Sequence, residues 1–207
     1  MSEKEPLENE PEEFPEDSSP FVILNTPAPG ADPLRKIGLY GPINEENCAD
    51  VVYSLFTFWD KKKKTTEKED EPVEIVISTH GGDAAEMFGV YDVMRLFRHD
   101  HQLGTYGIGK VMSAGVLLLA AGSKGHRRIG KHCRVMMHSV ASGHMGELYN
   151  LENELEEVQH TQQQYISALA AETKMSEKQI KKVMDKKINV YFTAEEAIKY
   201  GIADEVV

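Results

Sequence analysis

The sequence contains few cysteines, no long apolar run and no cluster of basic residues. Its 207 residues include two cysteines, Cys48 and Cys133, which form neither a disulfide framework nor a metal-ligand pattern. We therefore expect a reducing, cytoplasmic environment and no cofactor. No apolar stretch reaches the roughly 18 residues of a membrane span, so we expect no membrane insertion. The absence of a basic footprint predicts no nucleic-acid partner.

The net charge of −11 is concentrated at the N-terminus. Residues 1–17 hold eight acidic residues and one lysine, a net charge of −7, which leaves −4 for the rest of the chain. Prolines recur through the same region, and this composition predicts an acidic, Pro-rich disordered arm over residues 1–34. The arm is interpreted as a solubilising segment or as a docking segment for a partner. Residues 35–207 are then expected to form one domain.

Apolar segments of two kinds alternate after residue 35, which is typical of an α/β chain. Apolar residues three or four positions apart predict helices, and short continuous apolar runs predict strands. We expect strands at 36–41, 73–78, 103–108 and 134–138, helices from Asn44, over 83–98, from Ser113, over 144–172, over 176–186 and over 194–200, and a charged surface loop over 61–72. This order predicts a largely parallel sheet.

The segment 144–172 is predicted to be a long amphipathic helix. Its stripe steps by three and four residues from Leu148 to Leu169 and is apolar except at Gln162. The helix is longer than one side of a small sheet requires. Part of the stripe is therefore expected to contact another subunit, with packing inside the chain as the alternative.

Two polar residues stand out in apolar surroundings. Ser113 opens a helix, and His138 ends a strand 25 positions later. Buried polar side chains need hydrogen-bond partners, and a serine–histidine pair that bonds internally is a candidate nucleophile and base. Taken singly, the serine is a helix N-cap and the histidine a core residue. The local pattern is not the Gly-x-Ser-x-Gly of hydrolases, because position 111 is valine.

Donors for an oxyanion are expected from two backbone positions. Ala114 lies at a helix N-terminus, where N–H groups have no partner within the helix. Gly82, in the pair Gly81-Gly82 after the strand at 73–78, can approach a substrate closely. All of these residues follow the carboxyl ends of strands, where α/β ligand sites form. Together they predict acyl transfer with Gly82 and Ala114 as the oxyanion hole.

From Ile37 onward the chain resembles ClpP, the family of proteolytic subunits of the ATP-dependent Clp protease. The similarity covers about 170 residues and rests on several motifs. The matching segments are Gly81-Gly82, Gly109 through Gly122, Lys124-Gly125-His126-Arg127, Arg134 to His138, Tyr191 to Ala197 and Tyr200 to Asp204.

The resemblance implies a ClpP/crotonase-like α/β fold of repeated β-β-α units with a protruding helix-strand handle. It implies a serine endopeptidase in which Ser113 is the nucleophile and His138 the base, with Gly82 and Ala114 as oxyanion donors. It also implies heptameric rings paired into a tetradecamer that degrades peptides and unfolded proteins in a chamber. ATP would be used only by a partner, an AAA+ unfoldase; another ClpP-type subunit is a further expected partner.

The chain departs from the family at the third catalytic position. Aligning Tyr191 to Ala194 places Asn189 where the family has an aspartate. Asn189 could orient the histidine without charge, and Asp185 is an alternative third residue. Lys110 suggests a Ser–Lys arrangement, although a solvated lysine is the simpler interpretation.

Three other functions are compatible with the sequence. One is a weakly active or inactive regulatory ClpP-like subunit, as Asn189 suggests. Another is a viral capsid-maturation protease of ClpP-like fold. A third is a crotonase-type protein that binds acyl-CoA, although that function leaves the pair Ser113 and His138 unexplained.

Overall fold

The computed structural model describes residues 35–62, 72–143, 145 and 147–207. The predicted arm at 1–34 and residues 63–71 of the predicted loop lie outside the described residues. Arg35–Val207 forms one compact unit.

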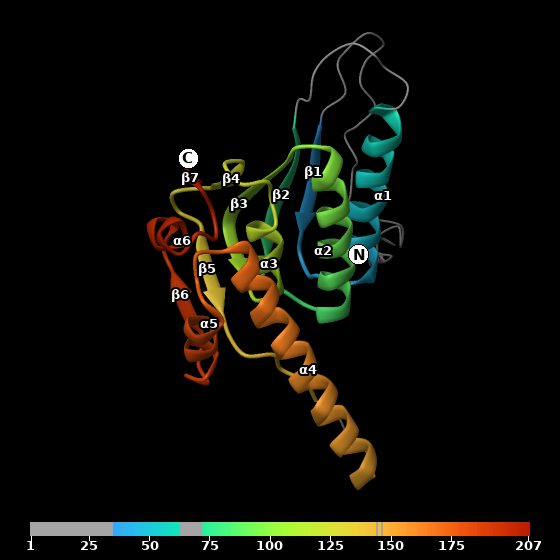
Figure 1. Ribbon diagram of the computed structural model, residues 1–207, viewed down its shortest axis with the longest axis vertical. Coiled ribbons are helices and arrows are strands. Elements are labelled where there is room, and N and C mark those ends of the chain that lie inside the picture. Colours follow the sequence, from blue (N-terminus) through green and yellow to red (C-terminus); the bar gives the residue numbers. More distant parts are fainter. Residues whose placement is uncertain (1–34, 63–71, 144, 146) are drawn as a thin grey trace, which may run out of the picture. The chain divides into compact units, whose positions relative to one another are not determined.

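A mainly parallel sheet forms the centre of the unit (Figure 1). Its order is β1-β2-β3-β4-β7, and β5 pairs with both β3 and β6. Every described pairing is parallel except that of β5 with β6. The strands are β1 (Lys36–Tyr40), β2 (Val73–Thr79), β3 (Leu103–Met112), β4 (Arg127–Ile129), β5 (Arg134–Met137), β6 (Val190–Phe192) and β7 (Glu205–Val206).

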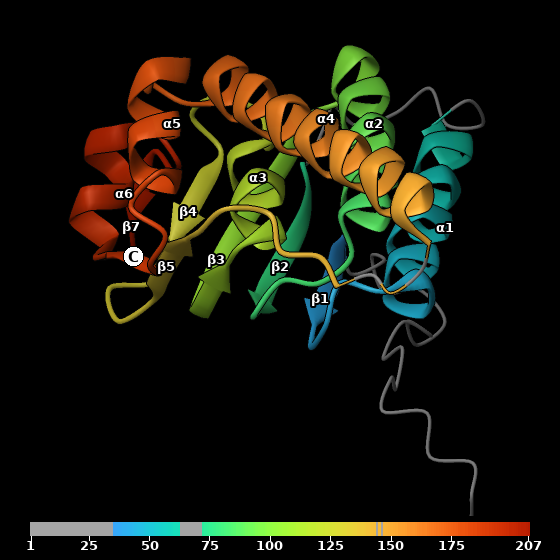
Figure 2. The same cartoon turned by 90° about the horizontal axis from the view of Figure 1, so that it is seen from below.

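Helices α1 to α4 lie on one side of this sheet, and α5 and α6 lie beside β5 to β7 (Figures 1 and 2). The helices are α1 (Glu45–Lys62), α2 (Ala84–Asp100), α3 (Ala114–Ala120), α4 (Leu148–Glu172), α5 (Glu177–Met184) and α6 (Ala194–Tyr200). Asp83 caps α2 by accepting hydrogen bonds from the N–H groups of Ala85 and Glu86. The predicted α/β fold with a largely parallel sheet is confirmed.

The largest difference from the sequence prediction is the length of β3. We expected the strand to end at Ile108, but it continues to Met112. Gly109 has a φ of 62°, a conformation that favours glycine, and β3 changes partner at this point. It pairs with β4 before Gly109 and with β5 over Lys110–Met112. The helix that follows is correspondingly short.

Other boundaries also differ. The predicted loop at 61–72 begins too early, because α1 runs through Lys62. Helix α4 begins at Leu148 and not at residue 144, and 139–143, 145 and 147 form neither helix nor strand. Strands β4, β6 and β7 had no prediction; each is two or three residues long, too short for a period to be recognised.

Helix α3 is the buried centre of the fold. All seven of its residues are buried. It packs closely on β2, because a Cβ on Gly115 would lie 2.4 Å from Cγ2 of Thr79. Its position is therefore fixed, and Ser113, the residue before it, is held by a rigid element.

Helix α4 has two unlike halves. Tyr165, Ile166 and Leu169 in its second half are buried, and this half packs against α3 and α5. In its first half Leu148 is 65% exposed and Leu155 is 58% exposed. The stripe predicted from the sequence is thus buried within the chain only over the second half of the helix.

Candidate active site

Ser113 occupies a strained turn between β3 and α3. Its φ of 53° and ψ of −124° lie outside the regions that non-glycine residues usually adopt. Its N–H donates to the carbonyl of Met136 at 2.8 Å, which ties the turn to β5. The side chain makes no capping hydrogen bond. The N-cap interpretation therefore does not account for this serine, and its hydroxyl is available for other chemistry.

Gly81 allows the serine to approach β2. A Cβ at this position would lie 2.6 Å from Cβ of Ser113, closer than real Cβ atoms approach. Its φ of 99° is also unfavourable for other residues. In this site, Gly81 after β2 is therefore the glycine that lets a neighbouring segment approach the serine. A glycine at position 111, as in the hydrolase pattern, is not needed for this.

Two backbone N–H groups beside Ser113 have no hydrogen-bond partner in the described part of the chain. Gly82 lies opposite Ile43 in an isolated parallel bridge, whose hydrogen bonds use Gly81 O and Asp83 N. The N–H of Gly82 therefore faces away from Ile43. Ala114 is the first residue of α3, so its N–H has no acceptor within the helix.

His138 follows β5 and is half-buried. Its Nδ1 lies 2.5 Å from the carbonyl oxygen of Ser139. Because a carbonyl oxygen can only accept, Nδ1 carries the proton and Nε2 is left as the basic nitrogen. Within the described residues, no hydrogen bond joins His138 directly to Ser113.

Ser113, His138, Gly82 and Ala114 line one pocket of about 580 Å³. They arrive from the carboxyl ends of β3, β5 and β2, as parallel strands require. No lysine or arginine of the described ranges lines this pocket; its acidic lining residues are Asp83, Glu154 and Glu157.

The candidates for the third residue, Asn189 and Asp185, and the alternative base Lys110 lie outside this pocket. Asn189 is exposed, precedes β6 and does not line the pocket. Asp185 is exposed at the C-cap of α5 and does not line the pocket either. Lys110, half-buried on β3, is also outside the lining. The catalytic role of Asn189 stays a prediction.

Sequence reasoning missed the role of Tyr165. Tyr165 lies on the predicted apolar stripe between Gln162 and Leu169, where the sequence indicates only packing. It lines the pocket, and its hydroxyl donates to the carbonyl of Ser113 at 2.7 Å. Burial raises the pKa of this phenol, so the hydroxyl stays protonated as a donor. The only signal in the sequence was the hydroxyl of Tyr165 on the apolar stripe, because a buried hydroxyl needs a hydrogen-bond partner.

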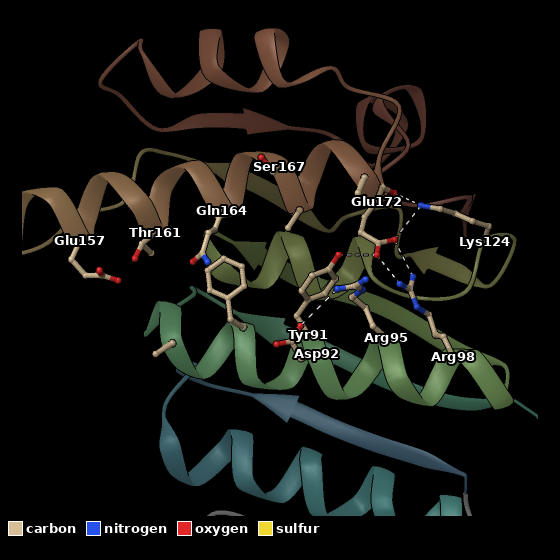
Figure 3. Close-up of a pocket in the computed structure, with 14 residues that line it drawn as sticks. Tyr91, Asp92, Arg95, Arg98, Lys124, Glu157, Thr161, Gln164, Ser167 and Glu172 are labelled. Atoms are coloured by element: carbon tan, nitrogen blue, oxygen red, sulfur yellow. Dashed lines mark hydrogen bonds and ion pairs between the residues drawn. The ribbon is translucent and has the colours of Figure 1, made fainter.

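A larger pocket, of about 1010 Å³, lies between α2 and α4. Neither Ser113 nor His138 lines it. Figure 3 shows Tyr91, Arg98 and Lys124 converging on Glu172 at one end of it. These groups are paired with one another through hydrogen bonds and ion pairs, so they stabilise the fold and supply no nucleophile.

Neither cysteine is suited to act as the nucleophile. Burial, assisted by the charge of Glu86, raises the pKa of Cys48 to about 11, and burial raises that of Cys133 to about 11. Thiolate is therefore scarce near neutral pH. The described residues also contain no cluster of three or more metal-ligating side chains and no helix long and apolar enough to cross a membrane.

The described fold and pocket define an α/β protein with a serine and a histidine at the carboxyl edge of a parallel sheet. Residues 32–207 match the family model of the Clp protease. A curated relative, the ATP-dependent Clp protease proteolytic subunit 4 of Rhodococcus jostii (strain RHA1), is 32% identical over 141 residues, which cover 68% of this chain and 71% of that protein. The chain therefore belongs to the Clp protease family of ClpP-type peptidases, and its α/β fold is that of ClpP.

Proposed function

We propose that this ClpP-type peptidase is a serine endopeptidase that works through an acyl-enzyme. The observation that carries the proposal is the shared pocket of Ser113 and His138, with the unpaired N–H groups of Gly82 and Ala114 beside the serine. Nucleophile, base and oxyanion donors are the three devices that acyl transfer requires. The raised thiol pKa values leave serine as the best nucleophile in the described residues.

In the first step, Oγ of Ser113 attacks the carbonyl carbon of the scissile peptide bond. The new O–C bond forms while the carbonyl π electrons move onto oxygen, and the hydroxyl proton passes to Nε2 of His138. The N–H groups of Gly82 and Ala114 donate to the resulting oxyanion. The C–N bond then breaks, and His138 returns the proton to the leaving amine.

In the second step, water replaces the amine. His138 takes a proton from the water as its oxygen bonds to the acyl carbon. The ester bond to Ser113 breaks, and the proton returns to Oγ. The products are a carboxylic acid and the regenerated serine. The proton on Nδ1 of His138, held by Ser139, keeps Nε2 in the basic form that both steps need.

The surroundings of the pocket support an extended peptide as substrate. Beyond the end of β2, Gly82 is bridged on one side to Ile43, and its free N–H faces the other side, where an extended peptide can pair with it. By analogy with the relative's name, degradation of folded proteins would depend on ATP. We assign that ATP use to an AAA+ unfoldase partner, and we propose assembly into heptameric rings and a tetradecamer in the cytoplasm.

A fluorophosphonate probe tests the proposal directly. The probe should form one adduct, at Ser113, located by peptide mass spectrometry. His138→Ala should slow labelling by about 10³-fold or more, because the serine loses its base. Ser113→Ala is the matched control and should abolish labelling. An intact assembly that does not react with the probe would overturn the proposal and favour the inactive regulatory subunit.

The same assay decides the role of Asn189. As the third catalytic residue it would orient His138, and Asn189→Asp would then raise the labelling rate by about tenfold or more through the added charge. Asn189→Ala would lower it. Unchanged rates in both variants would remove Asn189 from the mechanism and leave the Ser139 carbonyl as the group that orients the ring.

A further inference from the structure

Tyr165 joins the long helix α4 to the proposed nucleophile. Its side chain is only 5% exposed, and its hydroxyl donates to the carbonyl oxygen of Ser113 at 2.7 Å. That carbonyl also accepts from the N–H of Val116 at 3.0 Å. In the described residues, Tyr165 is the one side chain that bonds to the backbone of Ser113.

The bond to Ser113 acts on Ala114 because the two share a peptide unit. The carbonyl of Ser113 and the N–H of Ala114 belong to one trans peptide plane and point in opposite directions. A donor that fixes the carbonyl therefore fixes the direction of the N–H. A hydrogen bond to the carbonyl also polarises the peptide and strengthens the N–H as a donor.

This peptide unit needs an external restraint. Ser113 has a φ of 53°, a sparsely populated conformation for a residue with a Cβ. Such a conformation persists only where the surroundings hold it. The N–H of Ser113 donates to the carbonyl of Met136 on β5. Its carbonyl accepts from the hydroxyl of Tyr165 on α4. The two anchors fix the peptide planes on both sides of the nucleophile.

We propose that Tyr165 is a positioning residue of the oxyanion hole. Its hydroxyl holds the Ser113–Ala114 peptide so that the N–H of Ala114 faces the pocket. This inference rests on the proposed function, because the direction of that N–H matters only where an oxyanion forms. It links the geometry of the site to α4, the helix whose first half is exposed.

The test replaces the hydroxyl alone. Tyr165→Phe should lower kcat for a fluorogenic peptide amide by about tenfold while KM stays within about twofold, because the lost alignment affects the transition state and not the bound substrate. A peptide aldehyde, whose adduct with serine carries the oxyanion, should bind about tenfold more weakly. The cleaved product peptide should bind as it does to the parent.

Tyr91→Phe is the matched control. Tyr91 is also buried, and its hydroxyl donates to Glu172 at 3.0 Å, away from Ser113. We expect its kcat and aldehyde affinity to equal those of the parent. A Tyr165→Phe variant with the parental kcat and aldehyde affinity would overturn the inference, as would equal losses of activity in the two variants.

The parent protein separates this inference from the proposed function. A parent that fails to label with the fluorophosphonate probe would defeat both. A parent that labels at Ser113, together with a Tyr165→Phe variant that binds the aldehyde with parental affinity, would defeat only the role of Tyr165.

Discussion

Gly81 determines how closely β2 can approach the serine. The missing Cβ leaves room for Ser113, whose own Cβ would otherwise be 2.6 Å away, and the φ of 99° adds a conformational penalty for any other residue. Both effects displace the nucleophile or strain the turn that holds it. A change of one methyl group at Gly81 should therefore affect chemistry as well as stability.

Gly81→Ala is expected to slow fluorophosphonate labelling of Ser113 by about 100-fold, because a displacement near 1 Å misaligns the nucleophile. It should also lower the free energy of unfolding by about 1–3 kcal/mol, through the positive φ. Labelling kinetics and urea denaturation measure the two effects separately.

Gly89→Ala is the control for this substitution. Gly89 is an exposed residue of α2, and no atom lies within 4 Å of the position of an added Cβ. Alanine there should raise stability by up to about 1 kcal/mol, since glycine is a poor helix former. Its labelling rate should match the parent. Parental labelling in Gly81→Ala would contradict the close-approach argument.

The residues of the site differed in how well the sequence indicated them. Ser113 and His138 were recognisable because polar residues are rare in apolar segments and because the motifs around them are specific. The strained φ of Ser113 could not be recognised from the sequence, since position 111 lacks the glycine of the hydrolase pattern. The bond from Tyr165 to the serine carbonyl joins residues 52 positions apart, and only tertiary packing brings them together.

Glu172, the last residue of α4, connects this helix to α2 and to the segment between α3 and β4. Arg98 of α2 forms two hydrogen bonds to its carboxylate, at 2.6 and 3.0 Å, and Tyr91 of the same helix donates a third at 3.0 Å. Lys124, between α3 and β4, lies 3.5 Å from the carboxylate, and because its side chain is more than half exposed this ion pair adds little. Lys124 also donates a hydrogen bond to the main-chain carbonyl of Glu172. Figure 3 shows this convergence on Glu172. The cluster fixes the second half of α4 against α2.

The pKa of Glu172 predicts a pH-dependent contribution to stability. Burial favours the neutral form, but the hydrogen bonds and charge of Arg98 outweigh it and lower the pKa of Glu172 below its ordinary value. The carboxylate therefore stabilises the fold above the unfolded-state pKa, about 4.3, and this stabilisation is lost as the pH falls through the lower folded-state value.

Glu172→Gln should lower the free energy of unfolding by about 3 kcal/mol at pH 7, because Arg98 loses its buried partner. The difference from the parent should shrink as the pH falls below the unfolded-state pKa of about 4.3. It should continue to shrink until the parental carboxyl becomes neutral at its lower folded-state pKa. Urea denaturation at several pH values and one protein concentration measures the difference. A difference that is independent of pH would contradict the argument.

Asp92→Asn is the control, because it makes the same chemical change at an exposed carboxylate. Asp92 is 71% exposed and lies 4.0 Å from Arg95 one helical turn away. Such pairs contribute less than about 0.5 kcal/mol. The stability of this variant should follow that of the parent at every pH.

Elements with a clear period were predicted well, and elements that depend on partners were not. Helix α6 begins and ends where expected, and its capping box of Thr193 and Glu196 is a local signal. Strand β3 was predicted too short, because its last residues are held in the strand by pairing with β5. Strands β4, β6 and β7 likewise exist through their partners.

At the scale of the whole described unit, the first half of α4 is left uncovered by the described residues. It extends beyond the sheet in Figure 1, and its apolar residues are exposed. Tyr149 is 76% exposed, and Leu148 and Leu155 are similarly open. Because the second half is anchored by Tyr165 and Glu172, the exposed half is a rigid surface. In the ring assembly proposed above, a second copy of this chain would cover this surface.

Leu151→Ser combined with Leu155→Ser tests the assembly. Full burial of a leucine contributes about 1.5–3 kcal/mol. Leu151 is 37% exposed and Leu155 is 58% exposed, so the pair should contribute about 1.5–3 kcal/mol to each contact, which corresponds to a roughly 10- to 100-fold weaker association. Light scattering after gel filtration should show smaller particles than the parent.

Asn153→Ser, on the same exposed helix, removes no apolar surface and should leave the mass unchanged. A double variant of parental mass would show that subunits associate through another surface. A smaller particle that keeps the parental labelling rate at Ser113 would show that assembly and the catalytic site are independent. If subunit association through α4 affects the position of Ser113 by way of Tyr165, dissociation and slower labelling should occur together.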